Sequence, residues 1–281
     1  MIGYDRLGTN GRFGNQLFQY AALRGIAAHH GYDFCIPPDD HPTYANYGMH
    51  HPFKLPHLKH QGFVNNNNSP QAMYSYDNIK QLNSTPNVKE SVYYFDEEMF
   101  NNFQDGTNLD GFCQTEKYFK NIEQEIREDF AFKDEILEPC KEMMSDFEEA
   151  PLSLHIRRGD FLINSANHHN LGLDYYEKAL AEFPLEGSNI PVIIFSDDPE
   201  WCNEQEIFSD DRFLVSEGNS SYIDLCLMSL CEGHIIANST FSWWGAWLAN
   251  SKMVVAPSIW FGPNNAHLEI KDLYLDHWVK L

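Results

Sequence analysis

Apolar and polar positions follow two different patterns along the chain. Residues 1–150 are irregular, and their clearest signal is a 3.6-residue apolar repeat over residues 15–30, which predicts a helix that stops at Gly31. Short strands are expected at residues 1–4 and 32–36. The first half of the chain therefore predicts few regular elements joined by long connections.

Loop signals fill most of the remaining first half. Residues 37–90 are rich in His, Pro and Asn, including the Asn run at 65–68, and they predict long surface loops. A strand is expected at residues 91–95, and helices are expected at residues 117–129 and 134–148.

The second half is regular. Short apolar segments predict strands at residues 152–156, 191–195, 213–215, 234–237 and 253–256, and periodic segments predict helices at 174–182, 200–207, 221–230 and 241–250. Strands and helices that alternate at this spacing indicate a parallel, doubly wound sheet. The predicted fold class is α/β, with a boundary near residues 149–151 between an N-terminal domain (1–150) and a C-terminal domain (151–281).

Polar residues that directly follow a predicted strand are the strongest candidates for ligand binding, because ligands of open α/β sheets bind at the carboxyl ends of the strands. The motif HIRRGD at residues 155–160 places two adjacent arginines there, in a chain with only 19 lysines and arginines. Guanidinium groups bind phosphate through paired donors, Gly159 permits a close backbone approach, and Asp160 could orient one arginine. Two interpretations stay open, an anion site and a surface loop held by ion pairs.

Two more strand ends carry polar motifs. The segment NSTFSWWG at residues 238–245 runs into a helix, whose free N–H and hydroxyl groups could bind an anion or could form an ordinary cap, with Trp243 and Trp247 in the core. Asp197 and Asp198 could grip a ribose, a base or a metal, or could form only a turn and a helix cap. Combined with the arginines, these motifs favour a phosphate site.

Two candidate segments lie in the first half. GRFGNQ at residues 11–16 could present backbone N–H groups and amides to a ligand, and GFCQTEKYF at residues 111–119 mixes amide, carboxylate and aromatic groups as sugar-binding surfaces do. On local grounds each segment favours a capped helix start, with Asn15 or Thr115 as the capping residue.

Composition narrows the function classes. Forty-one acidic residues against 19 basic ones give a formal charge of −22, which argues against binding to nucleic acid or to an anionic membrane surface. The chain has no run of 18 apolar residues and no N-terminal signal pattern, so we expect a cytoplasmic protein without a membrane span. The six cysteines lack C-x-x-C spacing and the histidines form no ligand set, so we expect neither a disulfide scaffold nor a metal site.

In their order along the chain, five segments resemble the α-1,2-fucosyltransferases, which are inverting enzymes related to blood-group H synthases and to bacterial glycan fucosyltransferases. The segments are GRFGNQLFQYA, GFCQTEKYF, HIRRGD, FSDD and NSTFSWWGAWL. The resemblance spans residues 8–262. Within the family, the chain is more similar to the soluble bacterial or viral branch. Cys113 stands where the family more often has Trp, which leaves the acceptor preference open.

The resemblance implies a fold and a reaction. The fold is GT-B, with two Rossmann-like halves, of which the C-terminal half binds GDP-β-L-fucose and the N-terminal half supplies much of the acceptor side. The implied reaction transfers L-fucose with inversion to the 2-hydroxyl of a terminal β-galactoside on a glycan, and it needs no metal or other cofactor. A homodimer is compatible with the sequence.

The motifs and the resemblance together give the candidate residues. Those for donor binding are His155, Arg157, Arg158, Asp197, Asp198, Asp224, Ser239, Thr240, Phe241, Ser242 and Trp243. Those for catalysis are Arg157, on the β-phosphate, and Asn15, Glu116 and Asp160, as a base or polarising group near the attacking hydroxyl. Those for acceptor binding are Gln16, Gln114, Glu116 and Tyr118.

Alternatives stay open at this stage. They are a fucosyltransferase with another acceptor or linkage, a transferase for GDP-mannose-like donors, a non-catalytic nucleotide-sugar or glycan-binding protein, and an α/β scaffold without a ligand. Intact Arg-Arg-Gly-Asp and Ser-Thr-Phe-Ser segments favour an enzyme over a binding protein, which need not keep both. A scaffold leaves the clustering of polar motifs at predicted strand ends unexplained.

Overall fold

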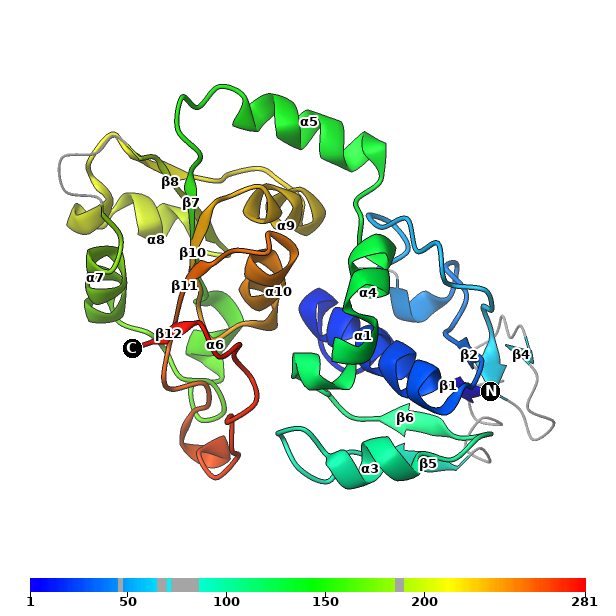
Figure 1. The fold of residues 1–281 in the computed structure, drawn as a ribbon. Coiled ribbons are helices and arrows are strands. Elements are labelled where there is room, and N and C mark those ends of the chain that lie inside the picture. Colours follow the sequence, from blue (N-terminus) through cyan, green and yellow to red (C-terminus); the bar gives the residue numbers. More distant parts are fainter. Residues whose placement is uncertain (45–47, 65–69, 72–85, 185–189) are drawn as a thin grey trace. The chain divides into compact units, whose positions relative to one another are not determined.

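The computed structural model describes residues 1–44, 48–64, 70–71, 86–184 and 190–281, and the Asn run at 65–68 lies outside them. The chain divides into two compact units (Figure 1). Unit 1 comprises Met1–Phe132 and Glu269–Leu273, and unit 2 comprises Lys133–Leu268 and Tyr274–Leu281. Helix α5 (Asp134–Met144) belongs to unit 2, where it packs on α9 (Ser221–Ser229).

Unit 1 is built on a four-stranded parallel sheet with the order β2-β1-β6-β5. These strands are β1 (Ile2–Gly3), β2 (Phe34–Cys35), β5 (Asn87–Lys89) and β6 (Asn108–Asp110). The chain leaves β1 toward β2 on one side, and β6 lies on the other side of β1. The carboxyl ends of β1 and β6 therefore form the point at which strand order reverses, which is where ligands bind in such sheets.

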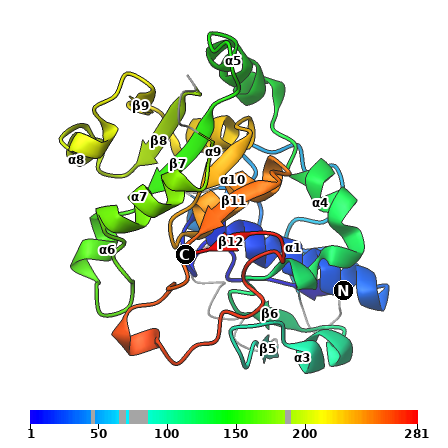
Figure 2. The same cartoon turned by 60° about the vertical axis from the view of Figure 1, so that its left-hand side comes forward.

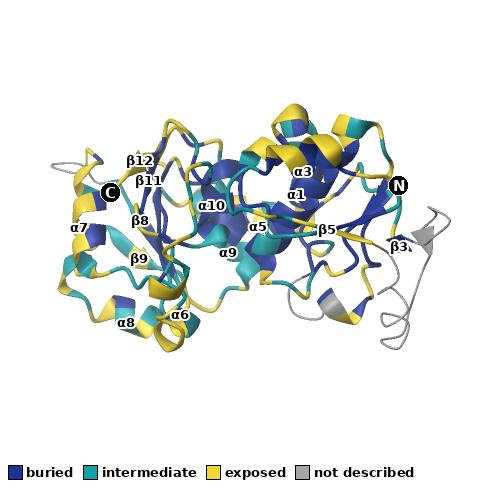
Figure 3. Ribbon diagram, turned by 90° about the horizontal axis from the view of Figure 1, so that it is seen from below, coloured by how far each residue is buried: buried dark blue, intermediate teal, exposed yellow. Residues whose placement is uncertain are grey.

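Helix α1 (Phe13–His30) forms the core of unit 1. Its side chains are buried from Phe13 to Ala27 on nearly every face, as the dark ribbon of Figure 3 shows. Gly25 lies where α1 meets the backbone of the 111–119 segment, because a Cβ at this position would be 1.8 Å from the carbonyl oxygen of Tyr118. Gly31 ends the helix with a φ of 68°, as its sequence position predicts.

Smaller elements complete unit 1. They are the 3-10 turns η1 (Pro42–Tyr44), η2 (Glu116–Tyr118) and η3 (Lys120–Ile122), the antiparallel pair β3 (Phe63–Val64) and β4 (Pro70–Gln71), and the helices α3 (Glu97–Asn102) and α4 (Glu123–Asp129). The late segment Glu269–Leu273 also packs here: Asp272 accepts hydrogen bonds from the Phe95 N–H (3.1 Å) and from Lys117 Nζ (2.7 Å).

Two predictions for unit 1 are wrong. The strand expected at residues 91–95 is a turn, because Ser91 donates both its N–H and its hydroxyl to Asp96, which also caps α3. The true strand, β5, ends just before it, at Lys89. The helix expected from residue 117 begins as the 3-10 turns η2 and η3, and becomes α-helical only at Glu123.

Unit 2 confirms the doubly wound prediction. Its six parallel strands have the order β12-β11-β10-β7-β8-β9, so strand order reverses between β7 and β10. The strands are β7 (Leu152–Ile156), β8 (Val192–Ser196), β9 (Phe213–Val215), β10 (Gly233–Ile235), β11 (Met253–Ala256) and β12 (Val279–Lys280). The connecting elements are α6 (Gly159–Ile163), α7 (Leu173–Ala181), α8 (Pro199–Asn203), η4 (Glu206–Phe208), α9, α10 (Thr240–Leu248) and η5 (Pro263–Asn265).

The two faces of this sheet carry different helices, with α7 on one side and α9 and α10 on the other (Figures 1 and 2). Alternating residues of β7 divide accordingly. Leu152, Leu154 and Ile156 join the core cluster with Tyr176 of α7. On the other face, His155 bonds to α10. This alternation directs a histidine, rather than an apolar side chain, at the start of α10.

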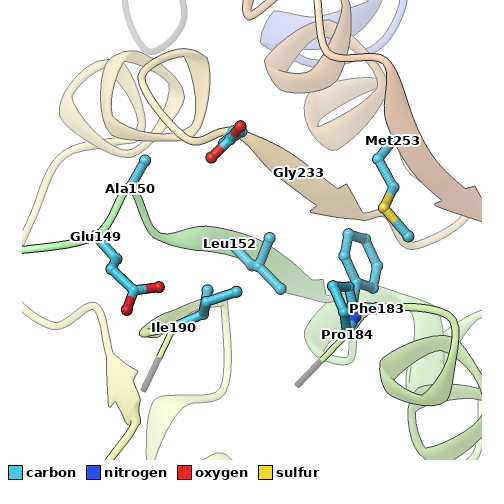
Figure 4. A pocket seen from close by; sticks show the side chains of 9 residues that line it. Glu149, Ala150, Leu152, Phe183, Pro184, Ile190, Gly233 and Met253 are labelled. Atoms are coloured by element: carbon cyan, nitrogen blue, oxygen red, sulfur yellow. The ribbon is translucent and has the colours of Figure 1, made fainter. Parts of the chain in front are cut away.

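A cavity of about 400 Å³ opens at the amino ends of β7 and β10, the edge opposite the arginine loop and the start of α10 (Figure 4). Its lining is mainly apolar and includes Leu152, Phe183 and Met253, with the carboxylates of Glu149 and Glu232 at its margin. By its position, this cavity is separate from the carboxyl-edge groups described next.

Candidate active site

Arg157 lies at the reversal point of the unit 2 sheet, immediately after β7. Its guanidinium bonds to Asp160 (2.5 Å) and to Asp197 (3.2 Å), and it stacks over the ring of Phe161 at 5.6 Å. The Arg157 side chain keeps 16% of its surface exposed. It is thus a held but accessible cation at the edge where a ligand would bind.

Arg158 is engaged by the protein itself. Its N–H donates to Asp197 (2.9 Å), its Nε donates to Asp198 (2.9 Å), and its guanidinium stacks 3.8 Å above Trp201. Asp198 also caps α8 by accepting the Trp201 N–H. Asp197 and Asp198 therefore act as a helix cap and as ion-pair partners of the two arginines. Together these acids fix the shape of the arginine loop.

Gly159 allows this loop to close. A Cβ at this position would be 2.6 Å from Asp197 Oδ2, which is nearer than real Cβ atoms approach. A side chain at residue 159 would therefore displace the carboxylate that holds both arginines.

The start of α10 faces the same edge, because it follows the neighbouring strand β10. Ser239 is its N-cap and accepts the Phe241 N–H. Thr240 and Phe241 form the first turn and are partly exposed, so their backbone N–H groups belong to an accessible helix N-terminus. Asn238 has a structural role, since it donates to the carbonyls of His169 and Trp260.

His155 links β7 to α10 across the reversal point. Its Nδ1 lies 2.9 Å from the Ser242 hydroxyl, and its ring lies 5.7 Å from that of Phe241. Burial, together with the nearby charge of Arg157, lowers the pKa of His155 to about 3, so the ring is neutral at physiological pH. Trp243, by contrast, is fully buried against Trp247 and Trp278 and belongs to the core.

Asp224 lies in the first turn of α9, close to the carboxyl end of β9. It accepts a hydrogen bond from Ser216 (2.8 Å), which follows β9, and Asn219 donates to the same hydroxyl (3.0 Å). Burial raises the pKa of Asp224, although the bond from Ser216 opposes that rise. The structure thus brings a carboxylate, a hydroxyl and an amide together at the carboxyl edge beside β8.

Unit 1 presents an amide cluster at its own reversal point. Gln114 donates to Asn15 Oδ1 (2.8 Å) and accepts a hydrogen bond from the Tyr93 hydroxyl. Gln16 is fully buried, and neither atom of its amide has a hydrogen-bond partner among the residues described. Glu116 is paired with Lys120 at 2.9 Å. Of the predicted acceptor-side residues, Gln114 lies in this network, Glu116 lies in a separate ion pair, and Tyr118 is buried and bonds to Glu90 and to the Asp96 N–H.

Unit 1 holds two further acids that no sequence motif indicated, Asp5, which is buried, and Glu90, which is half-buried. Asp5 follows β1 and bonds to Asn108, and burial raises its pKa to about 7. Glu90 follows β5, and burial raises its pKa to about 7, with a further contribution from Asp96. Both acids lie just after a strand, which is the position where ligand-binding residues are expected in such sheets. That signal was missed for Glu90 because the strand was expected at residues 91–95.

Two features concern the described residues only. Across residues 1–44, 48–64, 70–71, 86–184 and 190–281, no group of three or more His, Cys, Asp and Glu side chains is arranged to hold a metal ion. Over those same residues, no helix is both long and apolar enough to span a bilayer.

Known proteins are similar to this chain in sequence or in fold. An alpha-1,2-colitosyltransferase of Escherichia coli is 32% identical over 286 residues, covering 96% of each chain. The galactoside alpha-(1,2)-fucosyltransferase 1 of Rattus norvegicus is 26% identical, covering 96% of this chain and 70% of that protein. The crystal structure of NodZ alpha-1,6-fucosyltransferase soaked with GDP-fucose superposes with a TM-score of 0.55 at 14% identity, covering 92% and 94% of the two chains.

These similarities and the two parallel sheets define a glycosyltransferase with the GT-B fold. The model of glycosyl transferase family 11 matches residues 4–281. The chain belongs to that family, the family of the α-1,2-fucosyltransferases, and the resemblance found in the sequence motifs is confirmed.

Proposed function

We propose that this protein transfers L-fucose from GDP-β-L-fucose to the 2-hydroxyl of a terminal β-galactoside, with inversion and without a metal. The observation that carries the proposal is the placement of Arg157 and the α10 N-terminus on the two strands, β7 and β10, at which strand order reverses. A guanidinium beside the positive end of a helix at that point suits a diphosphate.

The proposed chemistry follows from where charge develops. As the sugar leaves with oxocarbenium character, negative charge grows on the GDP phosphate. Arg157, assisted by the N–H groups and hydroxyls from Ser239 to Ser242, would stabilise that charge in place of a cation. Asp224 and its Ser216 and Asn219 partners offer acceptors suited to the nucleoside, and His155 holds the start of α10 in position.

Acceptor binding is assigned to the amide cluster of unit 1. Asn15 and Gln114 offer donors and acceptors suited to sugar hydroxyls, and Gln16 and Tyr118 are the other residues proposed for the acceptor side. An amide is not a strong base, so Asn15 would orient the attacking hydroxyl. Asp160 and Glu116 are the carboxylates proposed to take its proton.

A second donor has specific support. The Escherichia coli relative with 32% identity is named an alpha-1,2-colitosyltransferase, so a GDP-activated colitose is the alternative donor. The choice between the two sugars changes the substrate and leaves the roles of Arg157 and α10 unchanged.

The test mixes purified protein with GDP-fucose, or with the GDP-linked colitose, and with lactose or N-acetyllactosamine in the presence of EDTA. Mass spectrometry and linkage analysis identify the product. We expect a Fucα1-2Gal product. A product formed only from the GDP-linked colitose would show that colitose, and not fucose, is the sugar transferred. Slow hydrolysis of GDP-fucose without transfer would show that the proposed acceptor is wrong. No GDP binding would refute the whole proposal.

A further inference from the structure

The 111–114 turn of unit 1 is held in an uncommon backbone conformation. Cys113 has a φ of 51°, which lies in the left-handed region that non-glycine residues rarely adopt, and its side chain is fully buried. Gln114, the next residue, directs its amide at Asn15 (2.8 Å). Such strained residues persist only where neighbouring groups hold them, and they are frequent at functional sites.

Glu90 is the group that holds this turn. Its Oε2 accepts the N–H of Phe112 (2.9 Å) and the N–H of Cys113 (3.1 Å), and its Oε1 accepts the Tyr118 hydroxyl (3.3 Å). The backbone N–H of Glu90 also donates to Asp110 (3.0 Å). The carboxylate thus satisfies two consecutive N–H groups that a left-handed turn points in one direction.

The fit between Glu90 and the turn is close. At Gly111, a Cβ would be 2.6 Å from Glu90 Cβ and 2.9 Å from its Oε2, so glycine is required for this approach. The Tyr4 hydroxyl fixes the same residue by donating to its carbonyl (2.7 Å). Among the residues described, no lysine or arginine pairs with Glu90, so its bonds to the turn are its main stabilising contacts.

We propose that Glu90 is a positioning residue for the acceptor: its carboxylate fixes the 111–114 turn, and the turn aims the Gln114 amide at Asn15. The inference rests on the proposed function, because it assigns acceptor binding to that amide pair. Both oxygens of Glu90 are already occupied by donors, so it acts through the turn rather than on the reacting hydroxyl.

The test compares Glu90→Ala, Glu90→Gln and the control Glu98→Ala, which changes an exposed glutamate in the first turn of α3. In Glu90→Ala we expect the acceptor KM to rise about tenfold or more, with GDP affinity changed less than about twofold. In Glu90→Gln the acceptor KM should stay within about threefold of wild type. The amide oxygen still accepts the two N–H bonds of the turn, and only the bond with Tyr118 reverses, because the NH₂ group donates to the hydroxyl oxygen. The control should match wild type.

Hydrogen exchange supplies a readout that does not depend on activity. Backbone amides of residues 112–115 should exchange about tenfold or more faster in Glu90→Ala, and near the wild-type rate in Glu90→Gln. Unchanged exchange in Glu90→Ala would overturn the inference even if the enzyme proves inactive. Faster exchange with an unchanged acceptor KM would overturn the acceptor role alone. Failure of wild type to transfer to any galactoside would instead refute the proposed function.

Discussion

Each unit contains an arginine held by two carboxylates, and the two clusters differ in access rather than in chemistry. In unit 1, Arg24 bonds to Asp129 (3.0 Å) and Glu125 (2.7 Å), and Asp129 is fully buried and also accepts bonds from Tyr20 and His57. In unit 2, Arg157 is 16% exposed against 8% for Arg24, and both of its acids, Asp160 (40%) and Asp197 (24%), keep exposed surface, whereas in unit 1 only Glu125 (46%) does.

The comparison shows that an arginine–carboxylate cluster is not in itself a site. The Arg24 cluster joins α1 to α4, and its central acid, Asp129, is fully buried and accepts hydrogen bonds from protein groups. The Arg157 cluster lies at the point of strand-order reversal and keeps part of its charge in contact with solvent. The first therefore stabilises the fold, and the second is available to a ligand.

The largest effect is expected for Asp129→Ala. It leaves the buried Arg24 without its main partner, so the free energy of unfolding should fall by about 3–5 kcal/mol. Urea unfolding followed by circular dichroism measures the change. Glu138→Ala, which removes an exposed i,i+3 pair with Lys141, is the control and should change it by about 0.5 kcal/mol or less. A loss below about 1 kcal/mol for Asp129→Ala would contradict the structural role of this cluster.

Arg157→Ala should act on turnover instead. Loss of a group that stabilises developing phosphate charge reduces kcat by about 10²–10³, whereas the free energy of unfolding should change by about 1 kcal/mol or less. Steady-state kinetics and urea unfolding separate the two quantities. Arg212→Ala, which removes an arginine paired with Asp210 before β9, should leave kcat unchanged. Normal turnover in a folded Arg157→Ala protein would remove Arg157 from the mechanism.

The units should also respond to pH in opposite directions. His234 is buried on β10, and burial lowers its pKa to about 4, below its ordinary value of 6.5. Its contribution to stability is therefore present above pH 6.5 and is lost as pH falls. Burial raises the pKa of Glu90 to about 7, so its contribution is present at low pH and is lost as pH rises through 7.

Variants that do not titrate isolate each group. Between pH 7.5 and 5.5, wild type should lose about 1 kcal/mol of stability relative to His234→Gln, and should gain about 1–2 kcal/mol relative to Glu90→Gln. Tryptophan fluorescence during urea unfolding reports on unit 2, because the chain's six tryptophans all belong to it. Circular dichroism reports on both units. Differences of the same sign would show that one of the two pKa shifts has the wrong direction.

The smallest effect concerns the link between β7 and α10. Ser242→Ala removes the partner of His155 Nδ1, so the melting temperature should fall by an amount equivalent to about 1 kcal/mol. Ser145→Ala, at the exposed end of α5, is the matched control. Equal melting temperatures in the two variants would mean that the histidine finds another partner.

Most of unit 2 could be predicted from sequence, because the strands from β7 to β11 are apolar runs that differ from the helices that follow, whereas the two-residue strand β12 gave no such signal. Residues 152–156, 213–215 and 253–256 match β7, β9 and β11 residue for residue. The arginine loop and the α10 start could be placed for the same reason, since their roles depend on strand ends. The short helix α6 was missed, because five residues are too few to show a repeat.

Unit 1 was harder to predict, because its strands have two or three residues and its stability depends on contacts distant in sequence. The strand β6, with the sequence NLD, carries no β-propensity signal, and it forms because it pairs with β1 and β5. The role of Glu90 could not be predicted for the same reason, because its partners, the N–H groups of Phe112 and Cys113, are 22 and 23 residues away. No local pattern could have indicated them.

The return of the chain to unit 1 at Glu269–Leu273 has a consequence for synthesis on the ribosome. Asp272, which receives bonds from Phe95 and Lys117, is translated after all of the unit 2 sheet except β12. Unit 1 is made first but obtains these contacts only when the last part of the chain emerges. A nascent chain arrested before Glu269 should therefore hold the 93–95 and 117 region of unit 1 less firmly than the released protein, even though every residue of that region is already present.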